Sequence, residues 1–207
     1  MENLVIVFTK NPELGKCKTR LAKSIGNEKA LQVYKALIQH TAKTIGKVDV
    51  NRVVFYSKRI QTQDFWDDAL FIKQVQSQGH LGQKMQAAFE WGFAQGYSKI
   101  CIVGSDLMEL EPRDIEEAFQ QLEDKDVVFG PANDGGYYLM GMNSLYKEAF
   151  LDKAWSTNTV LKNTLEDLKS LNVALLETKT DIDTLEDLKK HPEFHHYLPK
   201  EFKNKHL

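Results

Sequence analysis

The sequence predicts an α/β fold in which a mostly parallel central sheet lies between helices. Short apolar runs alternate along the chain with longer segments whose apolar residues recur every three or four positions. No internal repeat or Pro/Gly/Ser-rich linker divides the 207 residues, so we expect a single domain. In sheets of this kind ligands bind beyond the carboxyl ends of the strands, and functional residues are expected there.

The expected strands are seven short apolar runs. In chain order they are Leu4–Phe8, Arg52–Tyr56, Leu70–Val75, Lys99–Val103, Asp126–Phe129, Tyr137–Met142 and Val173–Leu176. The expected helices follow apolar stripes over residues 30–45, 81–92, 115–122 and 161–171. Glu28 after Gly26 marks one helix start and Pro112 another, because acidic residues and a first-turn proline favour helix N-termini.

Composition and charge exclude several classes of protein. The 27 Lys+Arg and 29 Asp+Glu give a net charge of −2, which argues against a nucleic-acid partner. No apolar run approaches the roughly 18–20 residues of a membrane span. Cys17 and Cys101 form no Cys-x-x-Cys pair, so neither a disulfide framework nor a zinc site is expected, and a cytoplasmic location is the default. Cys17 lies in a basic loop, where its pKa could fall.

A basic loop follows the first expected strand. Its five basic residues are Lys10, Lys16, Lys18, Arg20 and Lys23. With Glu13 as the one acid, the local charge is +4. Gly15 lets the backbone turn tightly before what looks like the first turn of a helix, and this arrangement suits a phosphate. The Walker A pattern is absent. A solvated basic helix start is the alternative interpretation.

Further candidates follow the fourth and fifth expected strands. Ser105 and Asp106 come directly after the fourth, where a carboxylate is well placed to hold Mg²⁺ or Mn²⁺, hard cations that prefer oxygen ligands. A cap or turn is the alternative there. The fifth is followed by Asp134, Gly135 and Gly136, a composition typical of a tight turn. The turn could be a hairpin leading into an aromatic edge strand, or a ligand site in which Asp134 binds a hydroxyl.

The last expected strand leads into an acidic segment that contains Asp181 and Asp183. Taken alone, Asp183 is best explained as the N-cap of a short helix that begins near Thr184, with Glu186 completing a capping box. Paired with Asp106, a second acid at a strand end would instead complete a divalent-metal site.

Five segments carry a resemblance to a known family. They are Lys10-x-Pro12-x-x-Gly15-x-x-Lys18-Thr19-Arg20-Leu21, Gly79–Met85, Gly104–Asp106, Gly130–Leu139 and Asp181–Leu188. They resemble the bacterial arsenosugar-biosynthesis-type or radical-SAM/selenodomain-associated transferases, glycosyltransferase-like proteins of the GT-A, nucleotide-diphospho-sugar transferase fold. The opening motif is also similar to that of the phospholactate guanylyltransferases.

The resemblance implies a GT-A-like domain over residues 1–190, with residues 191–207 as a tail packed on the same domain. It implies that Asp106 and Asp183 hold Mg²⁺ or Mn²⁺, with Asp181 as the alternative second ligand. The residues expected in catalysis are Asp106, Asp134, Lys18 and Arg20. Those expected to contact the nucleotide are Lys10, Gly15, Lys18, Arg20, Gly82, Ser105, Gly135 and Gly136.

The expected activity is glycosyl transfer from a nucleotide-diphospho-sugar to a hydroxyl group of a small-molecule acceptor. Nucleotidyl transfer, which would release pyrophosphate from an NTP, is the main alternative, because Lys18 and Arg20 suit either reaction. A nucleotide-binding module without turnover is the third.

Overall fold

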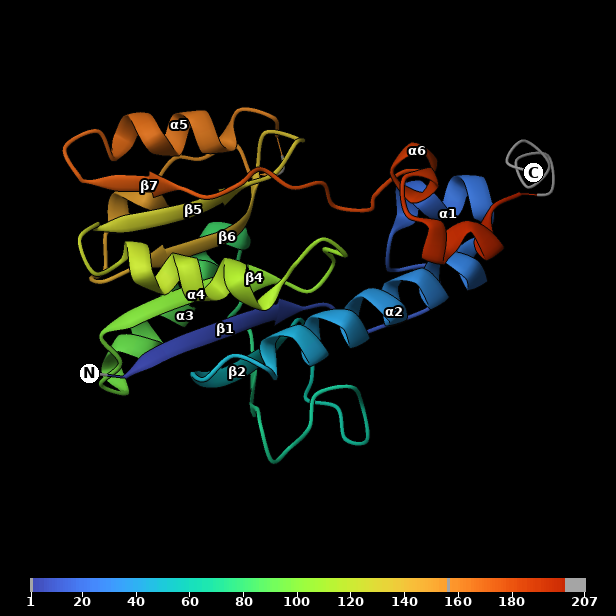
Figure 1. Ribbon diagram of the computed structural model, residues 1–207, viewed down its shortest axis with the longest axis horizontal. Helices are drawn as coiled ribbons and strands as arrows, with labels where there is room; N and C mark the ends of the chain where they lie inside the picture. The colour runs from blue at the N-terminus through green and yellow to red at the C-terminus, as the bar shows by residue number, and fades with distance from the viewer. Residues whose placement is uncertain (1, 156, 200–207) are drawn as a thin grey trace.

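The computed structural model describes residues 2–155 and 157–199 of the chain. Its centre is a seven-stranded sheet in the order β3-β2-β1-β4-β6-β5-β7 (Figure 1). The strands are β1 (Asn3–Thr9), β2 (Asn51–Tyr56), β3 (Ile72–Val75), β4 (Lys99–Gly104), β5 (Val127–Pro131), β6 (Tyr137–Met142) and β7 (Val173–Leu175). Neighbouring strands are parallel except where β6 pairs with β4 and β5. The mostly parallel α/β sheet expected from the sequence is therefore confirmed.

The strand β6 runs against its neighbours because a tight turn joins it to β5. Ala132 N donates to Gly136 O at 3.0 Å, and Gly135 N donates to Ala132 O at the same distance. The hairpin turn suggested by composition is thus present, but the expectation of an edge strand is wrong, since β6 lies between β4 and β5. This order places the turn, with Asp134, at the same edge of the sheet as the end of β4.

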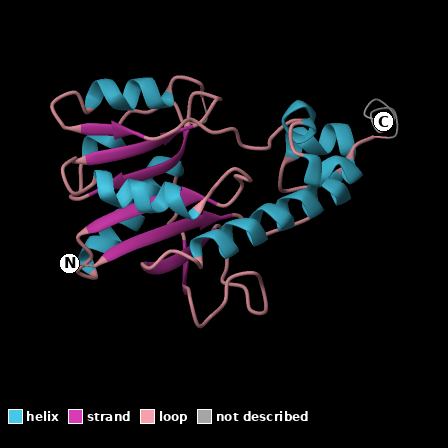
Figure 2. Ribbon diagram, viewed as in Figure 1, coloured by secondary structure: helices cyan, strands magenta, loops and turns pink. Residues whose placement is uncertain are grey.

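Helices cover both faces of the sheet (Figure 2). The long ones are α2 (Asn27–Ile45), α3 (Leu81–Ala94), α4 (Pro112–Gln121) and α5 (Val160–Asp167). Helices α2 and α4 pack over Val5 and Val7 of β1, whereas α3 and α5 pack on the opposite face, which carries Leu4 and Ile6. Burial on both faces explains why β1 is a continuous apolar run. None of the described helices is long and apolar enough to cross a membrane.

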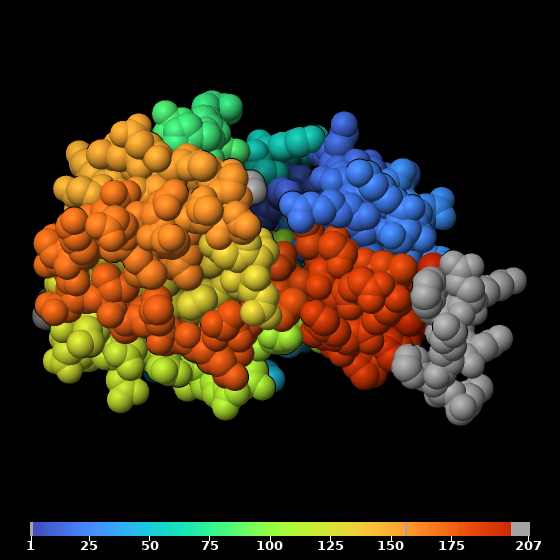
Figure 3. Space-filling model, turned by 90° about the horizontal axis from the view of Figure 1, so that it is seen from above, coloured from blue at the N-terminus to red at the C-terminus, as the bar shows by residue number. Residues whose placement is uncertain are grey.

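A third apolar cluster lies beyond the carboxyl ends of the strands. The short helices α1 (Thr19–Ile25) and α6 (Leu185–Lys189) contact each other there, and the 3-10 helix η2 (Pro192–Tyr197) packs with them. A second 3-10 helix, η1 (Lys147–Ala149), is not part of this cluster. In Figure 3 these C-terminal residues, in red, lie directly beside the blue N-terminal helices. The described part of the expected tail therefore packs on α1 and α2, while residues 200–207 lie outside the described residues.

The cap of α6 differs from the sequence expectation by one residue. The N-cap is Thr184, not Asp183, and its side chain accepts a hydrogen bond from Asp187 N, while Asp187 completes the capping box in place of Glu186. Glu186 pairs instead with Lys189. Thr184 and Asp187 together satisfy the free backbone N–H groups at the start of α6. The side chain of Asp183 is therefore not needed for the cap.

Candidate functional site

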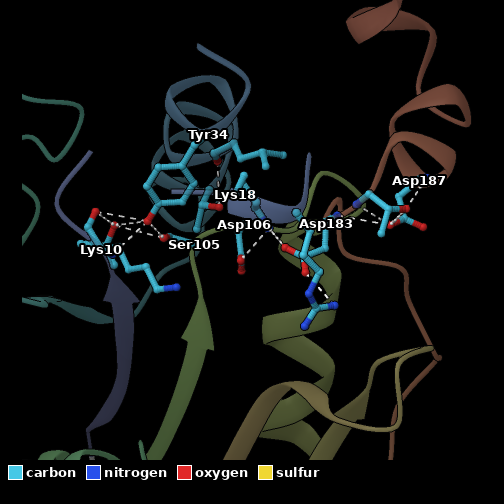
Figure 4. A network of polar contacts seen from close by, with 12 residues as sticks. Lys10, Lys18, Tyr34, Ser105, Asp106, Asp183 and Asp187 are labelled. Carbon is cyan, nitrogen blue, oxygen red and sulfur yellow. Dashed lines mark hydrogen bonds and ion pairs between the residues drawn. The ribbon is translucent and has the colours of Figure 1, made fainter. Parts of the chain in front are cut away.

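A buried lysine lies among the carboxylates beyond the strand ends (Figure 4). The side chain of Lys18 is 4% exposed, and its Nζ lies 2.9 Å from Asp106 Oδ2 and 3.6 Å from Asp183 Oδ1. Arg20 Nη1 lies 3.1 Å from Asp183 Oδ2. Four of the residues expected to be functional, from three separate motifs, thus form one ionic cluster.

The backbone at Lys18 has an unusual conformation. Lys18 is the N-cap of α1 and has the left-handed conformation, with φ 48° and ψ 48°. A non-glycine residue in this conformation costs about 1–2 kcal/mol, and here it is the residue whose side chain pairs with Asp106 and Asp183. Helix α1 therefore begins at Thr19, later than the start expected directly after Gly15.

The charges in the cluster stabilise one another. Burial lowers the pKa of Lys18, but the charges of Asp106 and Asp183 and the hydrogen bond to Asp106 outweigh burial, so its pKa is raised. Burial raises the pKa of Asp106, and the charge and hydrogen bond of Lys18 lower it by more, so its net shift is downward. Both groups therefore carry their charges at neutral pH.

Two cavities meet at this cluster, with volumes of about 330 and 170 Å³. Arg20, Asp106 and Asp183 line both of them. The smaller cavity adds the basic residues Lys10, Lys16 and Lys18, whereas the larger adds Asp134 and Asp181. One side of the junction therefore suits an anion such as a phosphate, and the other suits a cation or hydroxyl groups.

Asp181 shows the excess of negative charge in the larger cavity. Burial raises its pKa to about 6; the nearby carboxylates of Asp106, Asp134 and Asp183 also raise it, while Lys18 opposes them. A cation bound here would relieve this repulsion.

Apolar side chains form the rest of the larger cavity. They include Phe8, Leu81, Met85, Ile102, Tyr137, Tyr138 and Trp155. The indole of Trp155 packs on Gly82, where an added Cβ would lie 2.4 Å from the ring. Gly82, which was expected at the nucleotide, is therefore covered by Trp155 and is not among the described residues that line either cavity.

The other glycines expected at the nucleotide differ in position. Gly136 lines the larger cavity, and its N–H donates to Asp134 Oδ1 at 2.9 Å. Gly135 has φ +87°, and a Cβ there would lie 2.1 Å from Asn158 O, so it serves close packing in the turn. Gly15, with φ +71°, turns the basic loop and is not among the described lining residues.

Tyr34 is a candidate residue that the sequence did not reveal. Its hydroxyl oxygen accepts a hydrogen bond from Lys10 N at 2.9 Å and lies 3.3 Å from Ser105 Oγ, which donates to Thr9 Oγ1 at 3.0 Å (Figure 4). The network joins the ends of β1 and β4 and buries Ser105 directly before Asp106. In the sequence Tyr34 belongs to an apolar stripe. The one feature that could have indicated a polar role is its hydroxyl group, which requires a hydrogen-bond partner when it is buried.

Lys179 is a second such residue. Its Nζ lies 3.2 Å from Asp114 Oδ1, with these side chains 6% and 5% exposed, and donates to Glu109 O at 3.1 Å. Its backbone N donates to Pro131 O, and its carbonyl accepts from Asn133 N, both at 3.0 Å. One residue thus joins the loops after β4 and β5 to the segment after β7, the three segments that carry the carboxylates.

The donor chemistry of the junction fits Mg²⁺ or Mn²⁺. Within residues 2–155 and 157–199, no three His, Cys, Asp or Glu side chains are arranged to hold a metal ion by themselves. A Mg²⁺ ion carried on a phosphate, however, needs only one or two carboxylates from the protein. Asp106 and Asp183, which lie between the basic and acidic cavities, can supply them.

Cys17 does not have the lowered pKa that its basic surroundings suggested. The thiol is buried, with 3% of the residue exposed, and burial raises its pKa. The expectation of a lowered value is wrong because desolvation of the thiolate outweighs the charges of Lys10 and Lys18.

Comparison with known proteins supports the fold. The family described as "Uncharacterized protein conserved in bacteria (DUF2064)" matches residues 40–157, more than half of the chain. A protein from Desulfovibrio desulfuricans G20 with the provisional name nucleotide-diphospho-sugar transferase is 28% identical, with a TM-score of 0.85 over 91% of this chain and 85% of that chain. No curated protein matches the sequence.

More distant structures share the fold alone. A cytidylyltransferase from Leptospira borgpetersenii is 13% identical, with a TM-score of 0.59 over 98% of this chain and 90% of that chain. The 4-diphosphocytidyl-2C-methyl-D-erythritol synthase from Anaerococcus prevotii is 9% identical, with a TM-score of 0.58 over 90% of this chain and 92% of that chain. The nucleotide-diphospho-sugar transferase fold expected from the sequence is therefore confirmed.

Proposed function

The chain belongs to the DUF2064 family of bacterial proteins, and we propose that it is a metal-dependent transferase acting on a nucleotide-activated substrate. We favour glycosyl transfer, as in the arsenosugar-biosynthesis-type and selenodomain-associated transferases that its motifs resemble. The observation that carries the proposal is the junction at Asp106 and Asp183, where a basic cavity meets an acidic one. A nucleotide diphosphate and a hydroxylated group need these two environments side by side.

The smaller cavity would hold the phosphates. Its ammonium and guanidinium groups, from Lys10, Lys16, Lys18 and Arg20, can neutralise phosphate charge by charge-assisted hydrogen bonds. A divalent cation held by Asp106 and Asp183 would stabilise the negative charge of the leaving diphosphate.

The larger cavity would hold the transferred sugar and the acceptor. Its apolar wall can pack on a sugar ring, and Asp134 at the rim is exposed and can accept a hydrogen bond from the acceptor hydroxyl. In the transfer, the acceptor oxygen bonds to the anomeric carbon while the bond from that carbon to the diphosphate oxygen breaks. The hydroxyl proton goes to Asp134.

A melting-temperature screen with nucleotides and nucleotide sugars, with and without Mn²⁺, tests the proposal. A ligand at 100 times its Kd adds about 2.7 kcal/mol of apparent stability, which for a chain of this length raises Tm by about 5–11 °C. In Asp106→Ala the Mn²⁺-dependent part of this shift should disappear, while Asp124→Ala, an exposed acid outside both cavities, should retain it. No shift with any ligand would refute the proposal.

Nucleotidyl transfer is the second candidate, because a cavity with four basic residues can also neutralise a triphosphate. Here an acceptor oxygen would attack the α-phosphorus of an NTP and pyrophosphate would leave. Pyrophosphate release from an NTP with candidate acceptors would favour this reaction, whereas hydrolysis of a nucleotide sugar to a nucleoside diphosphate would favour glycosyl transfer. Binding without either product would indicate a nucleotide-binding module.

A further inference from the structure

We propose that Lys18 takes the place of the divalent cation in the ligand-free protein, so that the site binds metal and phosphate together and not the free metal ion. The inference rests on the proposed function and deepens it, because it names the metal–diphosphate complex as the species that the site selects.

The first argument is the position of the ammonium group. Nζ of Lys18 contacts one oxygen of each carboxylate expected to bind metal, at 2.9 Å from Asp106 and 3.6 Å from Asp183. A divalent cation binds carboxylate oxygens at about 2.0–2.6 Å. A metal ion on these oxygens would therefore lie against the ammonium group, and like charges at that separation repel strongly.

The second argument is that the ammonium group of Lys18 has an alternative position, in the smaller cavity. The residue also lines the smaller cavity, together with Lys10, Lys16 and Arg20. A phosphate in that cavity would attract the ammonium group, and the long flexible stem of lysine allows the head group to turn while the backbone stays in place. The oxygens that Lys18 contacts, Asp106 Oδ2 and Asp183 Oδ1, would then be free for the metal ion that the phosphate carries, while Arg20 would still pair with Asp183 Oδ2.

The third argument is the composition of the metal site. No three metal-binding side chains are arranged to hold an ion within residues 2–155 and 157–199, so the remaining ligands would be water or phosphate oxygens, and charged phosphate oxygens bind a divalent cation more strongly than water does. A free metal ion would find too few protein ligands, and the ammonium group of Lys18 would compete with it for the carboxylate oxygens. A metal–phosphate complex supplies the missing ligands and removes the competitor.

The coupling can be measured with Mn²⁺ alone, inorganic pyrophosphate alone, and the preformed Mn²⁺–pyrophosphate complex, each titrated calorimetrically into the intact chain. For the wild type, we expect the complex to bind at least about 5-fold more tightly than free Mn²⁺, the lower end of typical coupling between two ligands. In Lys18→Met, which keeps an unbranched stem and removes the ammonium group, free Mn²⁺ should bind at least about 5-fold more tightly than to the wild type, and pyrophosphate more weakly.

Two further variants distinguish the effect of the cation at the site from the effect of the protein's net charge. Lys18→Arg keeps a cation beside Asp106 and Asp183 and should retain weak binding of free Mn²⁺. Lys43→Met makes the same change in net charge at an exposed position of α2, outside the basic loop, and should leave all three affinities unchanged. If Lys18→Met does not fold, Lys18→Gln replaces it, and the wild-type comparison can by itself overturn the inference.

The inference fails if the wild type binds free Mn²⁺ as tightly as the complex, or if a folded Lys18→Met binds free Mn²⁺ no better than the wild type. These failures differ from failure of the proposed function. A protein that nucleotides stabilise without any Mn²⁺–pyrophosphate coupling would overturn this inference and leave the proposed function in place. One stabilised by no nucleotide, nucleotide sugar or pyrophosphate would overturn both.

Discussion

Removing one partner of the buried ion pair of Lys179 and Asp114 should strongly destabilise the protein, and Lys179→Met tests this. The substitution leaves the Asp114 carboxylate buried without its cation, and it leaves the carbonyl of Glu109 without the donor that lies 3.1 Å away. Removing one partner of a buried ion pair costs about 3–5 kcal/mol. For a chain of this length, Tm should therefore fall by about 6–20 °C.

Urea denaturation of three variants measures the cost and identifies its cause. The double variant Lys179→Met/Asp114→Asn removes the stranded charge and keeps an oxygen for the hydrogen bond from Glu111 N, so it should recover much of the loss. Lys99→Met is the matched control, because its partner Glu123 is exposed and such a pair contributes about 0–1 kcal/mol. A loss below about 1 kcal/mol in Lys179→Met, or a double variant no more stable than the single one, would refute the reasoning.

Three further predictions concern the cap, the turn and the thiol. Thr184→Ala removes the N-cap of α6 and should cost about 1 kcal/mol in urea denaturation. Gly135→Ala should cost about 2–4 kcal/mol in the same assay, because the added Cβ meets Asn158 O at 2.1 Å and the backbone has φ +87°. Cys17 should react with iodoacetamide more slowly in the folded protein than in urea, and faster as pH rises, because burial raises its pKa and only the thiolate reacts.

Each of these has its own control. Glu186→Ala, which alters the residue that the sequence favoured in the capping box, should leave stability within about 0.5 kcal/mol; a larger loss than in Thr184→Ala would contradict the observed cap. Gly96→Ala changes a glycine of similar φ with nothing within 4 Å of the added Cβ, so an equal loss there would show that the contact with Asn158 is unimportant. Rapid labelling of Cys17 in the folded state at neutral pH would contradict its burial.

The sheet could be predicted well from the sequence, because its signal is local. A strand such as β1, buried on both faces, is a continuous apolar run whatever its neighbours are. The order of the strands has no such local signal. The position of β6 between β4 and β5 depends on its pairing with β4, which lies far from β6 in the sequence. The turn at Asp134 and Gly135 could therefore be predicted, while the expectation of an edge strand was wrong.

For the site, the sequence could indicate which charged residues follow the strands but not how they pair. Lys18, Asp106 and Asp183 were identified by residue type and motif, and the structure brings them into contact. Their ion pairs depend on a left-handed backbone at a lysine, which no propensity predicts. Lys179 went unnoticed because the partners of a lone lysine are fixed only by tertiary packing.

The ion cluster joins three segments that lie far apart in the sequence, and this has a consequence for biosynthesis. Lys18 is made before Asp106, and Asp106 is made before Asp183. A growing chain could pair β1 with β4 soon after residue 104 has emerged, yet Lys18 would then have a single carboxylate partner. On the ribosome, the ion cluster would become complete only after residue 183 has emerged, so a chain made only as far as β4 would carry paired strands without the full cluster.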